Sequence, residues 1–210
     1  MLAYKFLNAE FGLKSLRERR LKISAIEDLN DPFELMPFEM TDRLRRRAFN
    51  ILKKNLNRGL IICFSSEWKD PVIWAHYSDK HKGLCLGFEI PKKHCKEITY
   101  VSRRLPCPEA IDLSHAQTTI FTKYINWSYE KEIRVWAEMK EKEGGLFYKP
   151  FDKQLKLVEV IAGARCKLRK SEIVDALHEL APQVRIIKAR AGFRRFEIVE
   201  NLQGFNRKRR

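Results

Sequence analysis

The sequence predicts an α+β protein built on a mixed β-sheet. Short apolar or alternating runs that are typical of strands recur along the whole chain, and segments with helical periodicity separate them. Hydrophobic residues make up 44% of the chain and aromatic residues 11%, which is the composition of a globular protein. The chain has 210 residues, no repeat and no linker-like stretch. We therefore expect one domain over residues 1–205 and a short basic tail over 206–210.

The first third of the chain predicts two strands and two helices. A strand over 2–6 is followed by an amphipathic helix over 9–20, in which Phe11, Leu13 and Leu16 face the core, and by a strand over 21–24. A helix over 41–57, closed by Gly59, follows the turn at 30–32. Its expected core face consists of residues at helical spacing: Leu44, Ala48, Ile51, Leu52 and Leu56.

The rest of the chain predicts more strands than helices. The continuous apolar run over 60–65 indicates a buried strand, and Asp70 followed by Pro71 indicates a helix start. Further strands are expected over 84–90, 98–101, 155–162, 184–189 and 196–199. Further helices are expected over 113–124 and from a Ser171 cap to 180, with a loop at Gly144-Gly145.

The net charge of +15 is concentrated in clusters, which favours a polyanionic partner. The helix over 41–57 carries six of the basic residues: Arg43, Arg45, Arg46, Arg47, Lys53 and Lys54. We expect these side chains to contact nucleic acid. A soluble basic surface without a partner is the other interpretation.

The five cysteines show no C-x-x-C spacing, so we expect no disulfide framework, no structural metal and a reducing, cytoplasmic location. The sequence shows no signal peptide, and no apolar run approaches the roughly 18 residues of a membrane span. We expect no contact with a membrane.

Two glutamates two residues apart mark the expected start of a strand. Residues two apart on an extended chain point to the same face, so Glu130 and Glu132 would present their carboxylates together. We expect Arg134 on the opposite face. Paired carboxylates can stabilise positive charge, hold a metal or bind a sugar hydroxyl, and they can equally be a solvated face.

Five ordered motifs resemble domain-of-unknown-function family 2971 (DUF 2971). They are Lys5-Phe6, Asn30-Asp31-Pro32-Phe33-Glu34, Cys63-Phe64-Ser65, the run from Trp74-Ala75-His76-Tyr77 to Gly83, and Lys123 with Trp127-x-Tyr129-Glu130-x-Glu132-x-Arg134. The resemblance covers nearly the whole chain, but the family label carries no activity, so the site must be argued from residues.

The layout also resembles the ADP-ribosyltransferase fold, a split mixed β-sandwich with flanking helices that holds NAD. That resemblance implies three elements: a polar residue on the first strand (Tyr4 or Lys5), an aromatic-Ser strand end (Phe64-Ser65), and Glu130-x-Glu132. The first-strand residue is neither Arg nor His, and Phe64-Ser65 is shorter than the usual Ser-Thr-Ser.

The resemblance implies catalytic roles for both glutamates. Breaking the bond between nicotinamide and ribose builds positive charge on the sugar, which a fixed carboxylate stabilises. We assign that role to Glu132 and the positioning or deprotonation of the acceptor to Glu130. The other residues expected at the NAD site are Tyr4, Lys5, Ser65, His76, Tyr77, Lys123, Trp127, Tyr129 and Arg134.

Several of these residues also have a structural interpretation. Asn30-Asp31-Pro32 can form a turn, beyond which Glu34 lies, Trp127 and Tyr129 can pack in the core, and His76 can be a hydrogen-bonded core histidine.

Three functions remain open. The first is an NAD-consuming ADP-ribosyltransferase-like enzyme, a bacterial toxin or antiviral effector that acts on nucleic acid or a bound protein and is held in check by an antitoxin or partner subunit. The second is a non-enzymatic nucleic-acid-binding module. The third is a nuclease that uses Asp31, Glu34, His76 and the paired glutamates as an acid or metal set.

Overall fold

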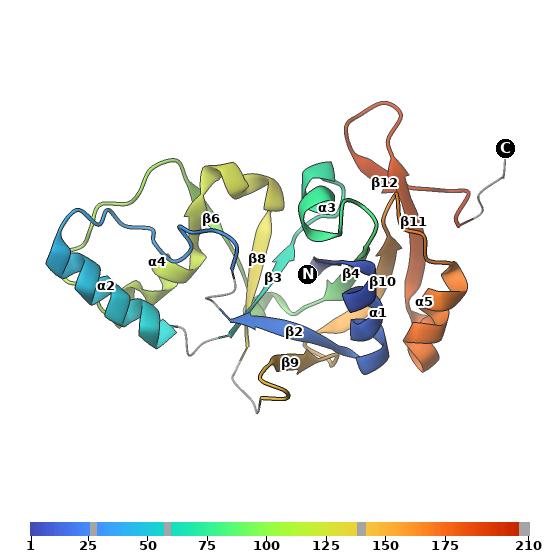
Figure 1. The fold of residues 1–210 in the computed structure, drawn as a ribbon, viewed down its shortest axis with the longest axis horizontal. Coiled ribbons are helices and arrows are strands. Elements are labelled where there is room, and N and C mark those ends of the chain that lie inside the picture. The colour runs from blue at the N-terminus through green and yellow to red at the C-terminus, as the bar shows by residue number, and fades with distance from the viewer. Residues whose placement is uncertain (26–28, 57–59, 138–141, 206–210) are drawn as a thin grey trace. The chain divides into compact units, whose positions relative to one another are not determined.

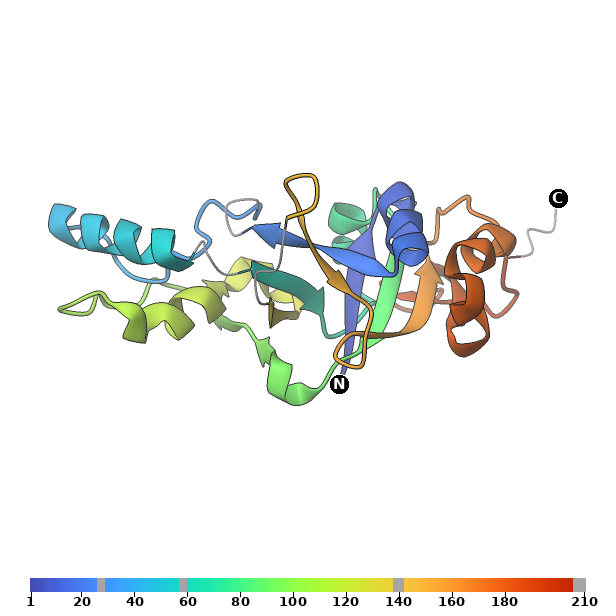
Figure 2. The same ribbon diagram turned by 90° about the horizontal axis from the view of Figure 1, so that it is seen from below.

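The computed structural model describes residues 1–25, 29–56, 60–137 and 142–205, which form an α+β fold (Figures 1 and 2). The chain divides into two compact units. Unit 1 comprises Met1–Leu21, Phe64–Lys92 and Lys149–Arg210, and unit 2 comprises Lys22–Cys63 and Lys93–Tyr148. The strands that run from one unit into the other are β2 (Arg20–Ala25), β3 (Leu60–Ser65) and β9 (Phe147–Pro150).

A mixed sheet with the strand order β12-β11-β10-β4-β1 forms the centre of unit 1 (Figure 1). Its strands are β1 (Leu2–Leu7), β4 (Leu84–Glu89), β10 (Lys156–Ala162), β11 (Arg185–Ala191) and β12 (Ile198–Glu200). Only β10 and β11 are parallel among these neighbours. A parallel pair requires a crossover connection, which α5 (Lys170–Leu177) and the 3₁₀ helix η5 (His178–Gln183) supply.

Two more helices complete unit 1. The helix α3 (Pro71–Tyr77) begins as the sequence predicts, because the Asp70 carboxylate accepts a hydrogen bond from the Val72 N–H at 2.7 Å. Trp74 on this helix is fully buried and its ring meets that of Phe6 edge-on at 5.0 Å. The helix α1 (Ala9–Glu18) buries Leu16.

Unit 2 has its own strands and its own core. β8 (Glu132–Ala137) pairs with β3 and with β5 (Cys95–Glu97), and β3 pairs with β2. The strands β6 (Thr99–Val101) and β7 (Thr122–Tyr124) form a separate parallel pair. The remaining helices are α2 (Arg43–Leu56), α4 (Ala116–Phe121) and the 3₁₀ helices η2 (Lys92–His94), η3 (Leu113–His115) and η4 (Ile125–Glu130), of which η2 crosses from unit 1.

The core of unit 2 lies between α2, α4 and β3. α2 runs alongside α4 in both views (Figures 1 and 2). The buried side chains that fill this space are Leu35, Phe38, Phe49, Leu52, Leu56, Ile61 and Ile120.

Four details differ from the sequence prediction. The expected helix over 113–124 is a 3₁₀ turn and α4, and residues 122–124 form β7 instead because they pair with β6. Leu44 and Ile51 are exposed on α2, while Phe49 takes the core position. Phe11 is exposed on α1, and Arg169 rather than Ser171 caps α5. Asn57, Gly59 and the tail 206–210 lie outside the described residues.

Candidate functional site

The segment from β7 to β8 places three charged residues close together. β7 supplies Lys123, the 3₁₀ helix η4 ends at Glu130, and β8 begins at Glu132. Between the glutamates, Lys131 has a φ of 44°, a left-handed conformation that turns the chain from the helix into the strand. Glu130 is therefore not part of an extended strand, and the same-face argument from residue spacing is wrong. The carboxylates are neighbours because both bind Lys123.

Five buried side chains form a continuous ion-pair network, which we call the charge cluster: Glu130, Lys123, Glu132, Arg134 and Glu34. The Lys123 ammonium group lies 2.6 Å from Glu130 and 3.0 Å from Glu132. Arg134 binds both carboxylate oxygens of Glu132, at 2.7 and 3.2 Å, and lies 2.7 Å from a Glu34 oxygen. The expectation that Arg134 faces away from the glutamates is therefore wrong.

The charge cluster is almost completely removed from solvent. No member exposes more than 7% of its surface, and Arg134 exposes 1%. Burial alone would raise the pKa of Glu132, but Arg134 and Lys123 outweigh it and lower this pKa to about 2. Burial would likewise lower the pKa of Lys123, yet Glu132 and Glu130 raise it. Glu132 and Lys123 are therefore both charged at neutral pH.

Glu34 differs from the other carboxylates because burial raises its pKa, and the attraction of Arg134 only partly offsets that rise. The turn expected at Asn30-Asp31-Pro32 positions this residue. The Asp31 carboxylate accepts a hydrogen bond from the Phe33 N–H at 2.9 Å, and its carbonyl accepts one from the Glu34 N–H at 2.9 Å. Asp31 thus shapes the loop, and Glu34 is the residue of this motif that joins the charge cluster.

Aromatic side chains surround Lys123 and the start of β8. The Lys123 ammonium group lies 4.9 Å from the centre of the Trp127 ring, which itself lies beside Tyr129 at 6.1 Å. The Tyr100 hydroxyl accepts a hydrogen bond from the Glu132 N–H at 2.9 Å, and burial raises the pKa of this hydroxyl to about 12. Sequence reasoning missed Tyr100, because a three-residue strand carries no pattern that would indicate the contact between Tyr100 and Glu132.

A cavity of about 370 Å³ lies in unit 2 and includes Lys123 in its wall. Arg103 and Arg104 line it together with Phe33, and the Arg104 guanidinium lies over the Phe33 ring at 5.5 Å. The other lining residues are Met36, Pro37, Val101, Ser102, Thr122 and Tyr124. Sequence reasoning also missed Arg103 and Arg104, although a pair of arginines after a predicted strand was a visible signal.

The expected first-strand and Ser elements come together in unit 1. Tyr4 on β1 is the register partner of Ser65 at the end of β3, and Lys5 pairs with Leu86 of β4. The Ser65 hydroxyl donates to the Glu67 carbonyl at 2.8 Å, so it closes a local turn. Burial, and then Glu159, raise the pKa of Tyr4. The charge cluster belongs to unit 2, and a common cleft for both groups stays a prediction.

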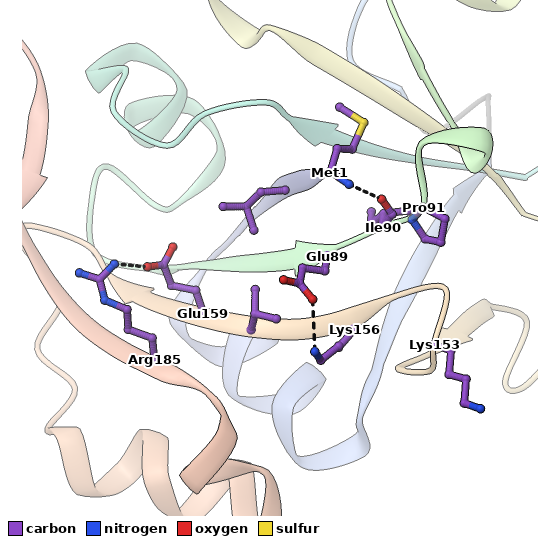
Figure 3. Close-up of a pocket in the computed structure, with 10 residues that line it drawn as sticks. Met1, Glu89, Ile90, Pro91, Lys153, Lys156, Glu159 and Arg185 are labelled. Carbon is purple, nitrogen blue, oxygen red and sulfur yellow. Dashed lines mark hydrogen bonds and ion pairs between the residues drawn. The ribbon is translucent and has the colours of Figure 1, made fainter.

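A second cavity, of about 620 Å³, lies in unit 1 beside Glu159 (Figure 3). Four of its charged lining residues form two ion pairs, because Arg185 binds Glu159 at 3.0 Å and Lys156 binds Glu89 at 3.2 Å. Trp74 is a buried core residue of this unit, whereas His76 is exposed and is not a core histidine. His76 lies edge-on to Tyr77 at 6.1 Å.

The basic residues of α2 lie mostly on its exposed side. Arg43, Arg45, Arg46, Arg47 and Lys54 are exposed, and Lys53 is half-buried. Arg46 donates to the carbonyls of Met40 and Thr41, at 2.7 Å each, and so ties down the start of the helix.

Comparisons with protein-family models, curated proteins and solved structures gave no match to this chain. The described helices include none that is both long and apolar enough to cross a membrane. In the described ranges, no three or more His, Cys, Asp or Glu side chains are grouped to hold a metal ion.

Proposed function

We propose that this protein is an ADP-ribosyltransferase-like enzyme that consumes NAD, with its catalytic carboxylates in the charge cluster. The convergence of the charge cluster is the observation that carries the proposal. Its members lie as far apart in the sequence as Glu34 and Arg134, and all belong to the motifs that resemble DUF 2971. Buried ionisable groups with shifted pKa values are found more often at functional sites than elsewhere.

The residues of the 370 Å³ cavity fit part of an anionic dinucleotide. Arg103, Arg104 and Lys123 supply three cationic groups for phosphate, and the Phe33 ring supplies a surface for stacking. The volume lies near the lower end of the range for small-molecule sites, so a mononucleotide portion fits best.

In the proposed reaction, the bond between the nicotinamide nitrogen and C1′ of the ribose breaks. Its electron pair leaves with nicotinamide, and a nucleophilic atom of the acceptor forms the new bond to C1′. Glu132 is ionised at neutral pH, as a carboxylate must be to stabilise the developing positive charge. Glu130 takes the proton that the acceptor releases.

Lys123 is the residue that connects the cavity with the carboxylates. Its ammonium group neutralises Glu130 and Glu132, and the same residue lines the cavity. We propose that a bound phosphate draws the Lys123 ammonium group away from the glutamates. Lys123 then neutralises less of the negative charge that Glu130 and Glu132 present to the ligand.

Incubation with radiolabelled NAD and mixed nucleic acid or protein acceptors tests the proposal. We expect release of nicotinamide by the wild type and a loss of at least about 100-fold in Glu132→Gln, since catalytic electrostatic groups contribute on that order. Glu97→Gln is the matched control, because Glu97 is an exposed glutamate of the same unit. A wild type that neither cleaves NAD nor transfers ADP-ribose would refute the enzyme proposal.

The exposed arginines of α2 favour a second function, which is nucleic-acid binding without catalysis. Arg43, Arg45 and Arg47 are exposed on α2, as phosphate-contacting residues must be. We expect their joint replacement by Gln to weaken binding to nucleic acid and to reduce the slope of log K against log salt by about 0.9 per lost phosphate contact on duplex DNA. An unchanged slope would exclude α2 as the binding surface.

A further inference from the structure

The loop between β11 and β12, residues 192–197, presents two phenylalanines to solvent. Phe193 exposes 89% of its surface and Phe196 is fully exposed. The loop extends beyond the ends of the two strands (Figure 1). Large apolar side chains in such a position are unfavourable in water, and neighbouring pairs of them mark interaction sites.

Hydrogen bonds define the backbone of this β11–β12 loop. The Gly192 N–H donates to the Glu197 carbonyl at 2.8 Å, and the Glu197 N–H donates to the Arg195 carbonyl at 2.9 Å. A side chain at position 192 would bring its Cβ within 2.9 Å of the Arg195 carbonyl oxygen, so the tight closure needs glycine. The two phenylalanines are thus presented by an ordered turn.

Two arginines separate the phenylalanines, and a third precedes them. Arg194 and Arg195 are exposed between them, and neither makes an ion pair with any residue that the structure describes. The Arg190 guanidinium lies over the Phe193 ring at 4.2 Å. With Glu197 as the one acidic side chain of the loop, residues 190–197 carry three positive charges and one negative charge.

We propose that the β11–β12 loop binds single-stranded nucleic acid. Exposed aromatic rings next to arginines are the elements that single-strand binding proteins use, because bases stack on the rings while guanidinium groups pair with phosphates. A duplex keeps its bases stacked on one another and offers no free base face. The loop therefore discriminates in favour of single strands.

Fluorescence anisotropy with a labelled single-stranded oligonucleotide and with its duplex tests this assignment. Phe193→Ala and Phe196→Ala should each weaken single-strand binding by about 5- to 150-fold, which is the contribution of one stacked base. In both alanine variants the slope of log K against log salt should stay unchanged, whereas Arg194→Gln should reduce this slope by about 0.7. Phe11→Ala, which removes an exposed phenylalanine of the same unit, should bind like the wild type.

Leucine and tryptophan variants separate stacking from simple hydrophobic contact. Phe193→Trp should keep the affinity, and Phe193→Leu should lose it nearly as Phe193→Ala does, because leucine has no π-face. Equal binding by the leucine variant would overturn the proposal, as would an equal effect of the phenylalanine variants on the duplex. Binding of the wild type to anionic lipid vesicles that is lost in both alanine variants, with no effect on the oligonucleotide, would overturn it as well.

Binding of single strands by the β11–β12 loop requires neither the proposed enzyme activity nor nucleic-acid binding by α2. A protein without activity on NAD can still lose single-strand binding in Phe193→Ala. If replacement of Arg43, Arg45 and Arg47 abolishes all binding while the β11–β12 loop variants change nothing, the loop assignment fails and the binding function of α2 stands.

Discussion

Replacement of Arg134 by Met tests whether the charge cluster holds unit 2 together. The guanidinium is 1% exposed, binds Glu132 with two hydrogen bonds, pairs with Glu34 and donates to the Ile120 carbonyl. Methionine is unbranched and flexible enough to occupy much of the same space without charge. Its introduction leaves two buried carboxylates and one carbonyl without this partner.

The size of the loss follows from the usual cost of a stranded buried charge, and the lowered pKa of Glu132 agrees with it. Removing one partner of a buried ion pair costs about 3–5 kcal/mol. The fall of the pKa of Glu132 from the ordinary value of 4.5 to about 2 corresponds to about 3 kcal/mol, to which Arg134 contributes most of the attraction. We therefore expect Arg134→Met to lower the free energy of unfolding by about 3 kcal/mol at pH 7.

The deficit should shrink as the pH falls from 7 to 4. Without Arg134, burial raises the pKa of Glu132, so protonation in that range stabilises the folded variant. The wild type behaves oppositely, because a lowered folded-state pKa gives stability that is present above pH 4.5 and is lost as the pH falls toward 2. Urea unfolding followed by circular dichroism at pH 7 and pH 5 measures both effects.

Two further variants make the test decisive. Arg103→Met replaces an exposed arginine of the same unit and should change the free energy of unfolding by less than about 0.5 kcal/mol. Glu132→Gln added to Arg134→Met removes one of the two stranded charges and should recover part of the loss. A deficit below about 1 kcal/mol, an equal deficit at both pH values, or no recovery in the double variant would refute the reasoning.

Two more variants examine the partners of Glu132 and Arg134. Tyr100→Phe removes the acceptor of the Glu132 N–H and should lower the free energy of unfolding by about 1 kcal/mol. An unchanged midpoint of urea unfolding would mean that this hydrogen bond does not contribute to stability. Glu34→Gln should be more stable relative to the wild type at pH 8 than at pH 4. The raised folded-state pKa of Glu34 gives stability that is present below pH 4.5 and is lost as the pH rises through that folded-state pKa. A stability difference that does not vary with pH would contradict this assignment.

The sequence predicts most strands well, because the apolar runs that signal them are also the buried strands of each unit. The residues of β1, β3, β4 and β10 lie within one or two positions of their expected bounds. The prediction fails where tertiary contacts decide. The local sequence of residues 122–124 does not end the predicted helix. These residues form a strand because β6 pairs with them.

The core face of α2 illustrates the same limit. Leu44 and Ile51 lie at helical spacing with Leu52, yet the surrounding residues Leu35, Ile61 and Ile120 select the face that contains Phe49. Helical periodicity shows that an amphipathic helix is present. Which of two overlapping apolar stripes is buried depends on what packs against it.

The members of the charge cluster could be named from the sequence, but their pairing could not. Residue spacing groups Glu130 and Glu132 for the wrong reason, since a 3₁₀ helix precedes the strand, and the expected strand places Arg134 on the wrong face. Glu34 lies about a hundred residues away along the chain and reaches Arg134 only through the turn that Asp31 closes. Long-range contacts of this kind leave no local periodicity.

The charge balance of the cluster bears on why it is buried at all. It contains three carboxylates and two cations, so with every member ionised it carries one net negative charge. A network that served only to stabilise the fold would gain by losing the unbalanced carboxylate, because an uncompensated buried charge is strongly unfavourable. The raised pKa of Glu34 is the direct expression of that penalty. In the proposed enzyme, the cation that develops during the reaction would supply the missing positive charge, whereas protonation of Glu34 would remove the surplus in the resting protein.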